Sequence, residues 1–163
     1  MNSATKYMQT IRLVNKEGED LNIIRSLMRE YAAELNENLC FQSFEAELDN
    51  PLKKYGEPAG CILLAIIDEV PAGCIALTPL QTPGTCEMKR LYVRPAYRKF
   101  GLGRELVERL LEIAKEKGYT KMQLDTLQRL TAAIKLYEQY GFTNTVPYNV
   151  NPIADVVYME KML

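Results

Sequence analysis

The spacing of hydrophobic residues along the chain predicts an alternation of helices and strands. Over residues 20–36 the apolar positions recur every three or four residues, which is the spacing of one helix face. The run Cys61–Ile67 is continuously apolar, as in a strand that is buried on both faces. Residues 72–78 show a second strand-like pattern after the turn at Asp68 and Glu69, so the two segments predict an antiparallel hairpin.

The other elements follow from the same patterns and from the positions of proline and glycine. They are a first strand over residues 7–14, a short helix from the cap Ser43 to Leu52, loops over 53–60 and 79–84, a strand over 122–126, a helix over 130–140, and closing strands over 142–146 and 156–162 joined by a loop over 147–155. This order predicts an α/β fold in a single domain, residues 1–163, with a mixed, mostly antiparallel central sheet of about seven strands and flanking helices.

Residues 87–117 hold the most informative pattern, which is a strand, a basic loop with two glycines, and a long amphipathic helix. Pro95 ends the strand because proline has no backbone N–H to donate. A glycine loop at the start of a helix offers unpaired N–H groups and the positive end of the helix dipole, so this loop can bind a phosphate. It is not a Walker loop, because Arg104 follows Gly103, and it is not a dinucleotide fingerprint, because Leu106 stands in place of the third glycine.

Two motifs, one in this loop and one further along the chain, carry a family resemblance. Arg98, Gly101 and Gly103 fit the pattern Gln/Arg-x-x-Gly-x-Gly/Ala, and residues 133–142 read AIKLYEQYGF. Together they resemble the acyl-CoA-binding loop and the late helix, ending in Gly-Phe, of the GNAT superfamily of N-acyltransferases. The motifs occur in the family's order, and a weaker resemblance extends from about residue 10 to the end of the chain.

The resemblance implies acetyl-CoA as the acyl donor and assigns residues to it. In the family, the fourth and fifth strands splay apart. The pantetheine arm of acetyl-CoA pairs with the exposed backbone of the fourth strand, which corresponds here to Leu91, Tyr92 and Val93. The segment that would bind the diphosphate comprises Arg98, Lys99, Phe100, Gly101, Leu102, Gly103 and Arg104. The alternative for its basic residues is an ordinary solvated loop.

The resemblance also implies a reaction, the transfer of an acetyl group from acetyl-CoA to a primary amine by direct attack in a ternary complex. The chain has no histidine, so acid–base chemistry must use other side chains or water. In family members the tyrosine at the place of Tyr137 protonates the departing thiolate, and a tyrosine with a pKa near ~10 carries its proton at neutral pH. The alternative for Tyr137 is packing on the buried face of its helix.

Glu87 is the candidate base, acting directly or through a water, because some relatives place a catalytic glutamate at the start of the fourth strand. One alternative is that Glu87 only pairs with Lys89 or Arg90, and another is that ordered waters serve as the base. Strict alternation along the strand places Glu87 on the same face as Lys89, Leu91 and Val93 unless a bulge intervenes.

Two positions depart from the family pattern. Lys99 replaces a glycine that many relatives carry after the arginine, and Leu130 replaces an asparagine that hydrogen-bonds to the cofactor arm. Both departures bear on the affinity for the cofactor. Tyr31 and Phe41 lie in the region that often shapes the acceptor site in this family, and for both the favoured interpretation is core packing.

The net charge, the length of the apolar runs and the spacing of the cysteines each argue against one kind of partner or site. A formal net charge of −1 argues against general nucleic-acid binding. No apolar run approaches the roughly 20 residues of a membrane span, and residues 1–10 lack a signal-peptide core, so we expect no membrane partner and a cytoplasmic location. Cys40, Cys61, Cys74 and Cys86 form no CxxC pair, so no metal site is expected, and Cys61 and Cys74 are expected to be buried packing residues.

The acceptor is expected to be a small-molecule or peptide amine, whose identity the sequence leaves open together with the oligomeric state, a homodimer included. Two alternatives to an enzyme follow from the same residues. One is a catalytically silent acyl-CoA-binding or regulatory module on the same fold. The other is an unrelated nucleotide-binding domain that uses the same glycine loop.

Overall fold

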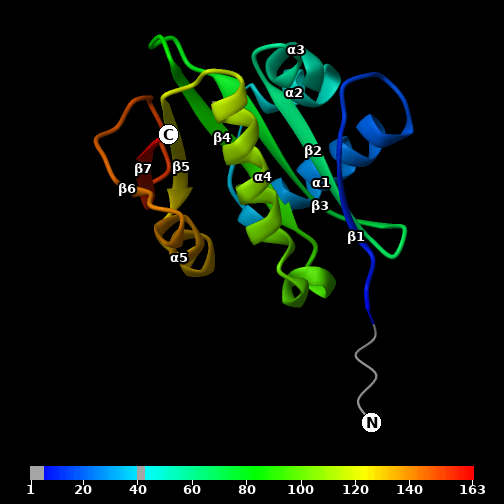
Figure 1. Cartoon of the computed structure of the whole chain (residues 1–163). Helices are drawn as coiled ribbons and strands as arrows, with labels where there is room; N and C mark the ends of the chain where they lie inside the picture. Colours follow the sequence, from blue (N-terminus) through cyan, green and yellow to red (C-terminus); the bar gives the residue numbers. More distant parts are fainter. Residues whose placement is uncertain (1–5, 40–42) are drawn as a thin grey trace.

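The protein forms one seven-stranded sheet, seen in a computed structural model that describes residues 6–39 and 43–163 (Figure 1). The strands lie in the order β1-β2-β3-β4-β5-β7-β6. Their bounds are β1 Gln9–Leu13, β2 Cys61–Ile67, β3 Val70–Pro79, β4 Thr85–Val93, β5 Lys121–Leu127, β6 Thr143–Asn144 and β7 Val156–Met162. Every neighbouring pair is antiparallel except β4 and β5. The predicted fold class is therefore confirmed.

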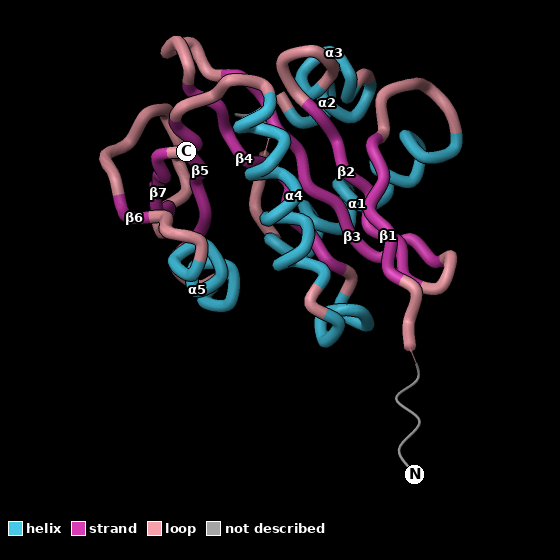
Figure 2. The backbone as a smooth tube through the Cα atoms, viewed as in Figure 1, coloured by secondary structure: helices cyan, strands magenta, loops and turns pink. Residues whose placement is uncertain are grey.

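Helices cover both faces of the sheet (Figure 2). They are α1 Glu19–Leu35, α2 Phe44–Asp49, α3 Pro51–Tyr55, a 3₁₀ helix η2 Pro95–Phe100, α4 Leu102–Glu116 and α5 Thr131–Gln139. Helix α4 packs its apolar stripe, which includes Leu102, Leu106 and Leu110, into one core cluster with residues of β2, β3 and β4. Helix α1 fills the other core with Leu21, Ile24 and Leu27. The two clusters make a three-layer arrangement, which buries both faces of the central strands.

The continuous apolar run of β2 is buried along its whole length, as its pattern predicts. Four local expectations were wrong. The helix expected from the cap Ser43 to Leu52 is divided at Asn50 into α2 and α3, and Ser43 makes no side-chain capping bond. Residues 53–55 are helical rather than loop, because Pro51 occupies the first helical position, where its missing N–H leaves no bond unmade, and starts α3. The first strand begins only at Gln9. The strand expected over 142–146 shortens to Thr143–Asn144, because only these residues pair with β7.

The parallel pairing of β4 with β5 is short. It runs from the pair of Thr85 and Lys121 to the pair of Glu87 and Gln123, and then stops. Beyond this point β4 keeps its bonds to β3 and β5 keeps its bonds to β7, but the two strands no longer bond to each other. The sheet is thus splayed between its fourth and fifth strands. Within the described residues, no helix is long and apolar enough to cross a membrane.

Candidate active site in the splay of the sheet

An outer pocket of about 430 Å³ opens where β4 and β5 part. Five of the residues predicted to bind the cofactor line it, namely Leu91, Tyr92, Val93, Arg98 and Gly103. The opposite wall is formed by the start of α5 and the residues before it. One edge of β4 faces this pocket without a strand partner, so its backbone groups can pair with a ligand instead.

The other predicted cofactor residues lie in the same turn but do not line this pocket. Gly101 adopts a left-handed conformation with φ 73° and precedes the first turn of α4. Leu102 is fully buried in the core, and Phe100 stacks edge-on against Tyr7. Arg104 donates a 2.6 Å hydrogen bond to Gln139. No hydrogen bond or ion pair fixes the Lys99 side chain to any described residue. The N–H groups at the start of α4 point out of the helix end, as the phosphate-binding prediction requires.

An inner pocket of about 60 Å³ adjoins the outer one at the tip of the splay. Both pockets are lined by Tyr31, Leu35, Leu91, Leu130 and Ala133. The inner pocket adds Leu39, Met88, Lys89, Arg90, Leu124, Asp125, Thr126, Leu127, Tyr137, Asn151 and Ile153. A ligand that follows the open edge of β4 would therefore end against Tyr137, the predicted acid.

Tyr137 is 6% exposed and makes no hydrogen bond to any residue in the part of the chain that the structure describes. Its ring packs edge-on against Phe142. Burial raises the pKa of Tyr137 well above its ordinary value, and the nearby Tyr31 and Asp125 raise it further. The hydroxyl is therefore protonated at neutral pH and has its donor free for a ligand in the inner pocket.

A β-bulge at Arg90 changes which side chains of β4 share a face. Arg90 has φ 60°, and the register with β3 shifts between the pair of Ala76 and Lys89 and the pair of Cys74 and Tyr92. Because of the extra residue, Leu91 packs with the α4 cluster, on the face opposite to Lys89. The shared face expected from strict alternation is thus wrong beyond Lys89.

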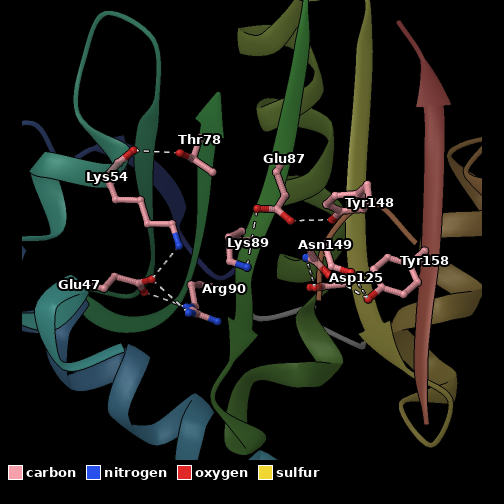
Figure 3. A network of polar contacts seen from close by, with 10 residues as sticks. All are labelled: Glu47, Lys54, Thr78, Glu87, Lys89, Arg90, Asp125, Tyr148, Asn149 and Tyr158. Carbon is pink, nitrogen blue, oxygen red and sulfur yellow. Dashed lines mark hydrogen bonds and ion pairs between the residues drawn. The ribbon is translucent and has the colours of Figure 1, made fainter. Parts of the chain in front are cut away.

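At the bulge, the Arg90 side chain forms a buried ion pair with Glu47 (Figure 3). Its Nε donates to Glu47 Oε2 at 2.8 Å and its Nη2 donates to Oε1 at 3.0 Å. Lys54 also contacts this carboxylate at 3.3 Å. Burial by itself would raise the pKa of Glu47, but the hydrogen bonds and charge of Arg90 outweigh burial and lower it. The pair ties α2 to the centre of the sheet.

Glu87 lies on the same face but is enclosed. Its Oε2 accepts a 2.6 Å hydrogen bond from the Tyr148 hydroxyl, and its Oε1 lies 3.7 Å from the Lys89 ammonium. Glu87 is 5% exposed and lines neither pocket. Of the two partners that the sequence allows for Glu87, the structure selects Lys89, because Arg90 is bound to Glu47.

The comparisons with known proteins agree with this geometry. The model of the acetyltransferase (GNAT) family matches residues 23–142. The chain belongs to the GNAT family. An uncharacterised N-acetyltransferase of Schizosaccharomyces pombe is 46% identical over 87% of this chain and 88% of its own length. An uncharacterised N-acetyltransferase of Escherichia coli is 29% identical over 74% of this chain and 72% of its own length.

Solved GNAT-type structures share the fold at low sequence identity. An acetyltransferase from Streptococcus agalactiae superposes with a TM-score of 0.76 at 22% identity, covering 94% of this chain and 98% of that one. An acetyltransferase from Salmonella typhimurium, solved with acetyl-CoA, has a TM-score of 0.67 at 22% identity, covering 94% of this chain and 93% of that one. These structures confirm the predicted fold, and the family model together with the relative from Schizosaccharomyces pombe confirms the predicted family.

Besides Tyr137, the inner pocket of this GNAT domain contains a polar side chain that the sequence did not predict there. Asp125 of β5 lines the inner pocket, and its Oδ2 accepts a 3.0 Å hydrogen bond from Asn149. Asn149 in turn accepts a 2.8 Å hydrogen bond from Tyr158 (Figure 3). The alternation of Met122, Leu124 and Thr126 already places Asp125 on the opposite face of β5, but its partner comes from a loop that the sequence shows only as polar.

The cysteines are packing residues where the structure describes them. Cys61, Cys74 and Cys86 are buried, and burial raises the pKa of each thiol to about 12. Within the described ranges, 6–39 and 43–163, no group of three or more acidic, cysteine or histidine side chains could hold a metal ion. Cys40 and Phe41 lie outside the described residues. Tyr31 packs against the core that α1 fills, as expected, and also lines both pockets.

Proposed function

We propose that this GNAT-family protein transfers an acetyl group from acetyl-CoA to a primary amine by direct attack in a ternary complex. The observation that carries the proposal is the pair of adjoining pockets in the splay, with predicted cofactor residues along the outer one and Tyr137 in the inner one. A thioester in the inner pocket would meet a protonated, buried hydroxyl at the place where its sulfur departs. The relative from Salmonella typhimurium solved with acetyl-CoA supports the choice of donor.

The pockets also fit the shape of the donor. The open edge of β4 can hydrogen-bond to the amide groups of a pantetheine arm, as an added strand would. The first turn of α4 supplies N–H groups and a positive dipole end for the diphosphate. Arg98 lies at this end of the outer pocket, where its Nε donates to the Val93 carbonyl at 2.9 Å and its Nη2 to Glu34 at 2.6 Å. Leu130 lines both pockets, and its side chain has no hydrogen-bonding group. In this proposal it therefore contacts the pantetheine arm through apolar atoms alone.

The reaction exchanges a C–S bond for a C–N bond. The amine nitrogen attacks the thioester carbonyl, a carboxylate or water takes the proton that the nitrogen loses, and Tyr137 gives its proton to the departing sulfur. Glu87 acts here through a water, since its carboxylate is enclosed by Tyr148 and Lys89. Asp125 is the carboxylate that lines the pocket itself, so it is the second candidate for the base.

The base can be assigned by measuring turnover against pH in Glu87→Gln and Asp125→Asn. The carboxylate that serves as the base should, when replaced by its amide, lower kcat by roughly 10²-fold or more and remove the acidic limb of the pH profile. The other variant should keep that limb. Retention of the acidic limb in both variants would assign the base to ordered water.

The proposed function is tested by calorimetric titration with acetyl-CoA and, as a control, ATP, followed by thiol release with a panel of amines. We expect one-to-one binding of acetyl-CoA, no comparable binding of ATP, and initial-velocity patterns that intersect, as a ternary complex requires. Binding without thiol release for any amine would favour the catalytically silent module. Membership of the GNAT family already removes the alternative of an unrelated nucleotide-binding domain. A cytoplasmic location and a homodimer stay predictions from the sequence.

A further inference from the structure

Lys89 is a buried cation that its protein partners leave poorly satisfied. It is 7% exposed and lines the inner pocket. Its closest partner is Glu87, 3.7 Å away, which is beyond hydrogen-bond distance, and the structure shows no hydrogen bond from its ammonium to a described residue. An ammonium group has three N–H donors, and Lys89 Nζ is not one of the fully buried described atoms that lack a partner, so its donors reach the pocket. The pocket that Lys89 lines is therefore the place where an acceptor for these donors would lie.

The ion pairs on the Lys89 side of the pocket hold more cations than carboxylates. Among the described residues they join Lys54, Lys89 and Arg90 to Glu47 and Glu87, and Asp125 lies across the pocket from them. Both carboxylates already accept hydrogen bonds from other groups. Glu47 accepts two from Arg90, and Glu87 accepts one from the hydroxyl of Tyr148. Burial lowers the pKa of Lys54, and the charge of Lys89 lowers it further, so the two ammonium groups repel each other. An anion beside Lys89 would relieve this excess.

The opposite wall of the same pocket carries a negative charge. Asp125 of β5 lines the inner pocket across from Lys89 of β4 (Figure 3). No ion pair within 4 Å joins these two described residues, so their charges face the pocket without neutralising each other. Asn149 occupies one oxygen of Asp125, Oδ2, and no hydrogen bond from a described residue reaches the other. A small ligand with both an ammonium and a carboxylate group would complete this arrangement.

We propose that the amine acceptor is a small amino-acid-type molecule, whose carboxylate is bound by Lys89 and whose amino group lies on the Asp125 side of the inner pocket. This inference rests on the proposed acetyltransferase function. The inner pocket, about 60 Å³, adjoins the outer pocket of about 430 Å³, so the acceptor and the thioester would meet where the two pockets join. Leu35, Leu39 and Ile153 give the pocket an apolar wall for the hydrocarbon part of the acceptor. Lys89 is then a specificity-determining residue.

The test compares acceptors that differ only in the carboxylate. A panel of free amino acids, their amides and the corresponding decarboxylated amines is assayed by thiol release with acetyl-CoA. We expect kcat/KM to be roughly 10- to 100-fold higher for the acids, which is the range for one hydrogen bond to a charged group. Lys89→Met should reduce this preference to within a few-fold, mainly through KM. Lys54→Met is the matched control, because Lys54 lines neither pocket and the preference should persist.

Three other outcomes would overturn the inference. Equal turnover of acids and amides by the unmodified protein overturns the inference and leaves the acetyltransferase function standing, and this comparison needs no variant. A loss of kcat in Lys89→Met that is the same for all acceptors would assign Lys89 to the transition state instead and also overturn it. Acetyl-CoA binding by calorimetry with no thiol release for any acceptor would refute the proposed function, and the inference with it.

Discussion

The hydroxyl of Tyr148 donates a 2.6 Å hydrogen bond to the carboxylate of Glu87, which is buried in the middle of the sheet. Tyr148 belongs to the loop between β6 and β7, and Glu87 to the last pair of β4 with β5 before the splay. This bond therefore fixes the C-terminal loop over the point where β4 and β5 part. Burial raises the pKa of Tyr148 and the charge of Glu87 raises it further, so the hydroxyl remains a donor at any pH where the protein is used.

Replacing Tyr148 with Phe should lower the free energy of unfolding by about 1–3 kcal/mol, because a buried carboxylate loses a hydrogen-bond donor. Urea denaturation measures the change. Tyr97→Phe is the control, since the Tyr97 hydroxyl bonds to no described residue, and it should stay within about 0.5 kcal/mol of the unmodified protein. Equal stability of the two variants would show that Glu87 gains a replacement donor, such as water.

Tyr137→Phe should keep acetyl-CoA affinity but lower turnover at least ~10-fold, within the range for general acid–base catalysis. The hydroxyl makes no hydrogen bond to a described residue, so its removal should cost little stability. Steady-state kinetics and calorimetry on the same preparation separate the two effects. Unchanged turnover would return Tyr137 to a packing role.

Gly103→Glu should abolish acetyl-CoA binding, because it adds a carboxylate to the wall of the outer pocket beside the proposed diphosphate site. A Cβ at Gly103 would lie 3.6 Å from Leu136 and 3.9 Å from Val93, which are ordinary contacts, so the variant should fold. Gly103→Gln adds the same bulk without charge, and calorimetry on both variants separates repulsion from blockage. Unchanged affinity in a folded Gly103→Glu variant would refute the assignment of the loop.

Glu47→Gln should cost about 3–5 kcal/mol at pH 7, because it leaves Arg90 without its buried counter-charge. The stability difference should also depend on pH. The pKa of Glu47 is lower in the folded than in the unfolded protein, so its contribution is complete above the unfolded value of about 4.3 and is lost as pH falls through the folded value.

The gap between the unmodified protein and Glu47→Gln should therefore narrow as pH falls from about 5 toward 3, in urea titrations at each pH. Glu45→Gln is the control, because Glu45 lies exposed on the same helix, and its stability should follow the unmodified protein throughout. A gap that stays constant with pH would mean that Glu47 does not titrate differently in the two states.

The fold and the residues that line the outer pocket could be predicted because their signals are local. The spacing of Leu102, Leu106 and Leu110 predicts the helix face that packs on the sheet, and these residues are buried there. Glycines at 101 and 103 follow a strand directly, so a phosphate-binding turn can be recognised within a few residues. The start of α3 at Pro51 was missed although its signal is local too, because proline also ends helices.

The acceptor half of the site could not be predicted in the same way. Tyr148 and Glu87 are 61 residues apart, and Arg90 and Glu47 are 43 apart, so no local pattern relates the partners. The bulge at Arg90 also moves every later side chain of β4 to the other face. An extra residue of this kind is stabilised by tertiary contacts. The alternation of apolar and polar residues along the strand does not predict its position.

The amino-acid sequence by itself determined the family, the order of the elements and the place of the glycine loop, because each depends on neighbours along the chain. Only the tertiary structure decided where charge lies at the reaction centre. It enclosed Glu87, placed Asp125 in the inner pocket, and left Lys89 facing that pocket. Burial and pairing set the chemistry of a charged side chain, and both are properties of the folded chain rather than of its sequence neighbours.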